Sequence, residues 1–131
     1  MELLIVEDQQ AMRAALRDLL ASAFPQIRIL QADSGAGALA ICHRERPQVV
    51  LMDIRLPDTN GIELTVHLRT YSPAPAVIVI SYLDGAEYAA QARAAGACAF
   101  ITKDRLASEL VPAVARALGI ARPSARKPKK P

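Results

Sequence analysis

The sequence has few cysteines and no spacing that would join them to a metal or to each other. Of the 131 residues only Cys42 and Cys98 are cysteines, and neither lies in a CxxC or Cys/His pair. This spacing speaks against a redox or metal pair. Because both thiols stand in alanine-rich surroundings, we expect them to be buried and to act as small apolar side chains.

Long hydrophobic runs are also absent. No run approaches the roughly 18 to 20 apolar residues that a membrane span needs, and the N-terminal MELLIVEDQQ carries acids where a signal peptide has a basic start. We therefore expect a cytoplasmic protein without a membrane partner. With 52% apolar and 22% charged residues, the chain is long enough for one domain that buries its core without disulfides or structural metal.

Excess charge of one sign is confined to the end of the chain. The last ten residues, RPSARKPKKP, hold five of the 16 basic groups and no acid, whereas residues 1–121 carry 11 basic and 13 acidic groups. The net charge of +3 therefore reflects the end of the chain, and the rest is mildly acidic. The composition predicts a domain over residues 1–118 and a disordered, basic Pro/Lys/Arg-rich tail over residues 119–131.

Short apolar runs recur five times, and stretches with helical spacing lie between them. Several runs are apolar on both faces and rich in Val and Ile, which is typical of parallel strands covered on both sides. The alternation predicts a doubly wound α/β sandwich with one five-stranded parallel sheet. The predicted strands are 2–7, 26–32, 49–53, 76–81 and 98–102.

Two helix ends can be predicted from single residues. The stretch AEYAAQARAAG closes on Gly96, a plausible residue just beyond a helix C-terminus. In LASELVPAVARAL, Pro112 predicts a helix that begins no earlier than about Ala107 or Ser108, with Ser108 as a candidate N-cap, because proline breaks a helix interior.

Polar residues follow four of the predicted strands: Glu7 and Asp8, then Asp53, Ser81 and Lys103. Doubly wound sheets bind ligands outside the carboxyl ends of their strands, where the winding reverses, so we expect these side chains to meet. Three converging carboxylates repel one another, and Mg²⁺, which takes carboxylate, water and phosphate oxygens, would neutralise them. A simpler alternative for Asp8 is that it caps the following helix.

Asp53 ends a run of four apolar residues and has two candidate roles. It is either a metal ligand alone or a nucleophile that accepts a phosphoryl group and becomes an acyl phosphate. Such a transfer needs the charge on the phosphoryl oxygens to be neutralised, which Mg²⁺ and an ammonium can do together. Lys103 is the only lysine before position 127. This favours Lys103 as the neutralising ammonium over a solvated surface lysine.

The motifs VED, LMDIRLPDTNGIEL, VIVIS and AFITKD together resemble the receiver domain of two-component response regulators, the CheY-like superfamily. The resemblance covers residues 1 to about 118 and implies a flavodoxin-like (βα)5 three-layer sandwich. Asp104 stands where the family usually has proline, and the pair Lys103-Asp104 is similar to NarL/FixJ-type regulators.

The resemblance also implies a role for each polar residue at the strand ends, and it adds a backbone ligand and an aromatic switch residue. On its own, this aromatic residue would be read as ordinary core. The resemblance implies Asp53 as phosphoacceptor; Glu7, Asp8, Asp53 and the backbone carbonyl of Arg55 as Mg²⁺ ligands; Lys103 as the partner of the phosphate; Ser81 as the switch hydroxyl; and Phe100 as the ring that moves in behind it.

The implied partners are a histidine kinase or a histidine phosphotransfer protein as donor and a downstream effector protein. Contact would use the fourth and fifth strand–helix units or the first and fifth helices, where a homodimer could also form. NarL/FixJ-type regulators usually carry a helix-turn-helix of about 60 residues, and 13 residues follow Leu118. We therefore expect no specific DNA binding. The expected protein is either a stand-alone receiver or a truncated relative of a transcription regulator.

Two other functions stay open. An aspartyl-nucleophile phosphohydrolase would want a general acid two residues beyond Asp53, where this chain has Arg55. A receiver-like binding module would work without phosphorylation. In the leading interpretation the chain catalyses only its own phosphorylation and a slow self-dephosphorylation, because bulky Tyr82 after Ser81 is expected to narrow access to Asp53.

Overall fold

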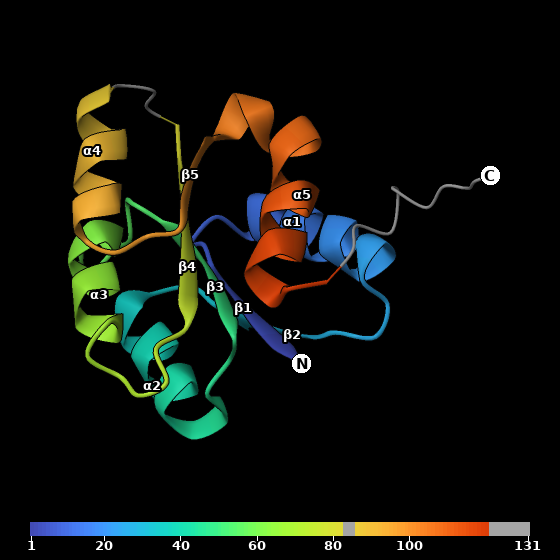
Figure 1. Ribbon diagram of the computed structural model, residues 1–131, viewed down its shortest axis with the longest axis horizontal. Helices are drawn as coiled ribbons and strands as arrows, with labels where there is room; N and C mark the ends of the chain where they lie inside the picture. Colours follow the sequence, from blue (N-terminus) through green and yellow to red (C-terminus); the bar gives the residue numbers. More distant parts are fainter. Residues whose placement is uncertain (83–85, 121–131) are drawn as a thin grey trace.

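The computed structural model describes residues 1–82 and 86–120, in which strands and helices alternate (Figure 1). The five strands form one parallel sheet in the order β2-β1-β3-β4-β5, which confirms the predicted doubly wound α/β sandwich. Most of the predicted tail, residues 121–131, lies outside the described residues. The strands are β1 (Glu2–Val6), β2 (Arg28–Ala32), β3 (Val49–Asp53), β4 (Ala76–Ser81) and β5 (Ala99–Thr102).

The helices cover both faces of the sheet (Figure 1). Each face has its own hydrophobic cluster, and successive residues of β1, β3 and β4 alternate between the two clusters. These strands are therefore buried on both sides, which explains their continuous apolar runs. One layer holds α1 (Gln10–Ala23) and α5 (Leu106–Leu118), and the other holds α2 (Gly35–Glu45), α3 (Gly61–Leu68) and α4 (Ala86–Ala94).

The C-terminal end of α4 follows the prediction. Gly96 has a positive φ of 104°, which glycine adopts without steric cost. Its amide donates to the Arg93 carbonyl at 2.9 Å, and the Ala97 amide donates to the Ala92 carbonyl at 3.0 Å. This pair of hydrogen bonds is the Schellman arrangement that ends a helix and returns the chain to a strand.

The predicted start of the last helix is wrong. After a short 3-10 turn, η1 (Lys103–Arg105), α5 begins at Leu106 and continues through Pro112. The Ser108 hydroxyl does not cap it but donates to the Arg105 carbonyl at 3.3 Å. The earlier start buries Leu106 one turn before Leu110, and this burial outweighs the single helical hydrogen bond that proline removes.

The prediction for the cysteines is right for one of them. Cys42 on α2 is buried, whereas Cys98 is exposed. Cys98 immediately precedes β5, an edge strand that has a neighbour on one side only, so no second strand covers it. Among the described residues, no helix has the length and apolar character to cross a bilayer.

Candidate functional site

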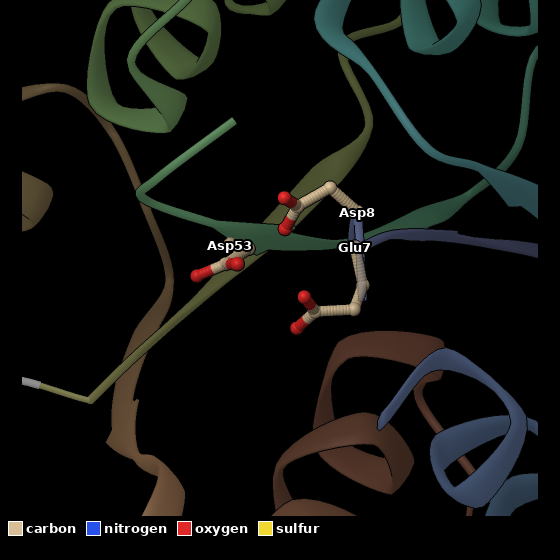
Figure 2. A group of neighbouring side chains, drawn as sticks. All are labelled: Glu7, Asp8 and Asp53. Atoms are coloured by element: carbon tan, nitrogen blue, oxygen red, sulfur yellow. The ribbon is translucent and has the colours of Figure 1, made fainter. Parts of the chain in front are cut away.

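Three carboxylates meet where the winding of the sheet reverses, between β1 and β3. Glu7 and Asp8 directly follow β1, and Asp53 is the last residue of β3. Figure 2 shows their side chains converging, and one carboxylate oxygen of each lies within 4.8 Å of the others. Glu7 and Asp53 are buried, whereas Asp8 is exposed. The predicted convergence is therefore confirmed, and the side of the cluster that faces solvent lies at Asp8.

The predicted lysine joins this cluster. Lys103 lies in η1, and its Nζ is 2.9 Å from Glu7 Oε1 and 3.5 Å from Asp53 Oδ2. Its side chain is only 4% exposed, so the ion pairs form away from bulk solvent, where charges interact strongly. One ammonium thus contacts two of three carboxylates, and the excess negative charge is what a divalent cation would neutralise.

The pKa of Asp53 is raised to about 6, first by burial and next by the negative charge of Glu7, while the ammonium of Lys103 partly opposes both effects. A bound cation favours the ionised form of a carboxylate, so cation binding would lower this pKa again. Protons and a divalent cation therefore compete for the same oxygens.

The raised pKa predicts how stability depends on pH in the absence of divalent cations. Because folded Asp53 binds its proton more tightly than the unfolded chain does, its ionisation destabilises the fold as pH rises from its ordinary pKa of 3.8 to about 6. We expect this group to lower the free energy of unfolding by up to about 3 kcal/mol across that window. Urea denaturation in a chelator, at several pH values, measures it. An Asp53→Asn variant should lose this part of the pH dependence, and an unchanged profile would contradict the assignment.

Asp8 does not take the simpler role of helix cap. The N-cap of α1 is Gln9, and no side-chain hydrogen bond closes that cap. The backbone amide of Gln9 donates instead to Glu7 Oε2 at 3.1 Å, and the Arg13 guanidinium donates to the Glu7 backbone carbonyl at 2.8 Å. The exposed carboxylate of Asp8 therefore does not cap α1 and belongs to the carboxylate cluster.

Gly61 allows α3 to begin directly against the backbone of Asp53. Its amide donates to the Ile54 carbonyl at 2.7 Å, and a Cβ atom at this position would overlap the Asp53 carbonyl oxygen. Backbone atoms cannot give way as a flexible side chain can. The glycine after LPDTN therefore fixes the loop that follows the candidate nucleophile.

Gly61→Ala tests this close approach. We expect the variant to lose about 1–3 kcal/mol of stability, as for other overpacked sites, and to shift the backbone around Asp53. Urea denaturation measures the loss, and amide chemical shifts of residues 53–55 report the displacement. Gly37→Ala is a matched control because its added Cβ would meet no atom closer than 3.2 Å. Equal stability of the two variants would contradict the close approach.

Asp58 was missed by the sequence analysis. Its carboxylate accepts hydrogen bonds from the amides of Gly35 at 2.8 Å and Ala36 at 2.9 Å, and these bonds lower the pKa of Asp58. It therefore ties the loop after β3 to the N-terminus of α2, a position that favours negative charge. The only sequence signal was an acid in the turn-rich stretch LPDTNG.

The remaining predicted residues occupy two places. Arg55, Ser81 and Asp53 line one cleft of about 480 Å³. Ser81 is buried at the end of β4 and pairs in register with Thr102 of β5. Phe100 lies two residues earlier on β5, outside this cleft, and is partly buried against the hydrophobic cluster on the α4 side of the sheet. The structure therefore separates the candidate switch ring from the nucleophile.

The chain resembles known proteins in sequence and in fold. The DNA-binding transcriptional activator DevR/DosR of Mycobacterium tuberculosis is 36% identical over 111 residues, which are 84% of this chain and 51% of that protein. A LuxR-family two-component response regulator from Aurantimonas sp. SI85-9A1 superposes with a TM-score of 0.82 at 29% identity, covering 91% of this chain and 86% of the other. The receiver domain of NarL from M. tuberculosis gives 0.81 at 27% identity, with 95% and 97% covered.

The chain spans about half the length of the curated relatives it matches. The family model of the response regulator receiver domain matches residues 3–115. That range contains the three carboxylates, Ser81 and Lys103, and the sheet order places them at one edge. The resemblance inferred from the sequence motifs is thus confirmed over most of the chain, which belongs to the response regulator receiver domain family.

Proposed function

We propose that Asp53 accepts a phosphoryl group from a histidine kinase or a histidine phosphotransfer protein, and that this modification changes the surface that an effector recognises. The observation that carries the proposal is the buried Glu7–Lys103–Asp53 ion-pair network with the open carboxylate of Asp8 beside it. The family match supports phosphorelay signalling as the setting. The phosphohydrolase alternative is not favoured, because position 55 offers arginine instead of a general acid.

Receiver domains bind Mg²⁺ at an acidic cluster, and the residues here fit that ion. Glu7, Asp8 and Asp53 would hold it with the backbone carbonyl of Arg55, an all-oxygen donor set of the kind Mg²⁺ prefers. When bound, the ion would supply positive charge to the transferring phosphoryl oxygens.

The chain's own residues account for the rest of the transfer. An Asp53 carboxylate oxygen attacks phosphorus, the P–N bond to the donor histidine breaks, and the imidazole leaves with the bonding electron pair. The Lys103 ammonium, now nearer Glu7 than Asp53, would move toward the new phosphoryl oxygens.

The switch follows from the same change in charge. A dianionic group on Asp53 attracts the Ser81 hydroxyl, and the space that Ser81 leaves on the α4 side of β4 is open to Phe100. We infer that the altered surface is used by an effector or a second copy of the chain, through α4–β5–α5 or α1 and α5. We further infer that the protein acts in the cytoplasm.

Intact-mass measurement after incubation with Mg²⁺ and acetyl phosphate tests the proposal. We expect one phosphoryl adduct that does not form in a chelator and that disappears slowly once the donor is removed. Continuous consumption of the donor without an adduct would indicate a hydrolase instead. An unmodified chain that binds Mg²⁺ would indicate a receiver-like module that works without phosphorylation.

A further inference from the structure

A tyrosine joins two of the loops at the cleft. Tyr82 directly follows Ser81, and its hydroxyl donates to Gln9 Oε1 at 2.9 Å. The centroid of its ring lies 3.9 Å from Lys103 Nζ, well within the range of a cation–π interaction. Tyr82 therefore contacts a residue of the first loop with its hydroxyl and the buried ammonium with its ring.

These contacts form a closed circuit of four residues beside the nucleophile, which Lys103 contacts at 3.5 Å. The side chain of Gln9 holds Tyr82, the ring of Tyr82 faces Lys103, and Lys103 pairs with Glu7. The backbone amide of Gln9 completes the circuit by donating to the Glu7 carboxylate. Tyr82 is 61% exposed, so burial contributes little to its position, and the two directional contacts hold it there.

We propose that Gln9 and Tyr82 form a strap that restrains the Lys103 ammonium on Glu7 and screens Asp53, and thereby slows both entry and loss of the phosphoryl group. The proposal deepens the proposed function and rests on it. Gln9 and Tyr82 are positioning residues, because both act through Lys103 and through access to the cleft that Tyr82 lines with Asp53.

The distances from Lys103 to its two partners indicate which movement the strap opposes. Lys103 is 2.9 Å from Glu7 and 3.5 Å from Asp53, so it must leave its nearer partner to reach a phosphoryl group. A ring held over the ammonium opposes that movement, and the same ring limits the approach of donor and water. A half-exposed cation–π contact and an exposed hydrogen bond each stabilise modestly, so we expect rate changes of about 3- to 10-fold.

Lysine NMR tests the restraint without any phosphorylation. The full chain has four lysines, Lys103 and three after position 126, so selective ¹³C labelling gives a simple spectrum. The Lys103 ε-methylene should be shifted upfield by the Tyr82 ring current. Gln9→Met keeps the side-chain length but removes the acceptor, so the shift should shrink. Gln9→Glu keeps an acceptor and should retain it, and Tyr82→Ala should abolish it.

Kinetics in the full chain test the consequence. With acetyl phosphate and Mg²⁺, we expect faster appearance and faster loss of the adduct in Gln9→Met and Tyr82→Ala than in wild type. Tyr82→Phe, which loses only the hydroxyl, should behave like Gln9→Met. The α1 cap uses no Gln9 side-chain hydrogen bond, so Gln9→Met should leave the melting temperature unchanged.

Failure of the strap proposal can be distinguished from failure of the proposed function. An upfield Lys103 signal that is unchanged in Gln9→Met, or adduct lifetimes equal to wild type in both Gln9→Met and Tyr82→Ala, would overturn the strap. A wild-type chain that takes no phosphate, while its Lys103 signal still depends on Gln9, would instead contradict the proposed function and support the restraint.

Discussion

Asp53→Asn is expected to abolish the phosphoryl adduct. The amide keeps the size of the side chain but is a far weaker nucleophile than a carboxylate, and it gives up one anionic ligand for Mg²⁺. The two other acids of the cluster are not expected to substitute, because Asp53 lines the cleft and neither Glu7 nor Asp8 is among the described residues that line it. Intact mass after incubation with acetyl phosphate measures the loss.

Asp18→Asn is the matched control for this change. Asp18 lies on α1, its side chain is 69% exposed, and its ion pair is with Arg17 on the same helix. This variant should accept one phosphoryl group as wild type does. An adduct of undiminished yield in Asp53→Asn would show that another residue is the acceptor.

Lys103→Met is expected to impair both stability and transfer. Removing one member of a buried ion pair leaves the other charges uncompensated, which costs about 3–5 kcal/mol. The loss of a positioned cation at the phosphoryl oxygens should also slow transfer by about 10²-fold or more. Urea denaturation and the rate of adduct formation measure the two effects separately.

The stability loss in Lys103→Met should depend on pH with a definite sign. Without the ammonium that opposes its shift, the pKa of Asp53 rises above about 6, so the ionised form destabilises the fold over a wider range. Stability should therefore recover as pH falls below that pKa. Millimolar Mg²⁺ should also restore part of it at neutral pH.

Arg105→Met provides the comparison for the lysine. Arg105 lies in the same short turn, but its side chain is 67% exposed and its contact with Glu109 is 3.9 Å long. Exposed pairs of this kind contribute little, so the variant should resemble wild type in stability and in phosphorylation. Equal effects of the two substitutions would argue against a special role for the buried ammonium.

The sheet and the carboxylate cluster could be predicted because strong local signals agreed with the topology. Continuous apolar runs identified β1, β3 and β4, and the acids at the carboxyl ends of β1 and β3 had to meet once the strands were parallel. Lys103 stood out because no other lysine precedes position 127. These features depend on burial and chain order alone, which a sequence contains.

Features that depend on competition between contacts could not be predicted. The start of α5 was misplaced because the burial of Leu106 outweighs the cost of Pro112, a balance set by packing. Cys98 was misplaced because an apolar neighbourhood in sequence does not reveal an edge strand. The hydrogen bonds that Asp58 accepts from the start of α2, and the one that Tyr82 donates to Gln9, join residues far apart in the chain. No local sequence pattern marks them.

Locating the acyl phosphate is the most direct test of the central claim, that a carboxylate cluster at the edge of the sheet presents Asp53 for phosphorylation. Borohydride reduces an acyl phosphate to the alcohol, so tandem mass spectrometry of the reduced protein should find homoserine at position 53. Modification at Glu7, Asp8 or Asp58 in place of Asp53, in a protein whose adduct requires Mg²⁺, would contradict it.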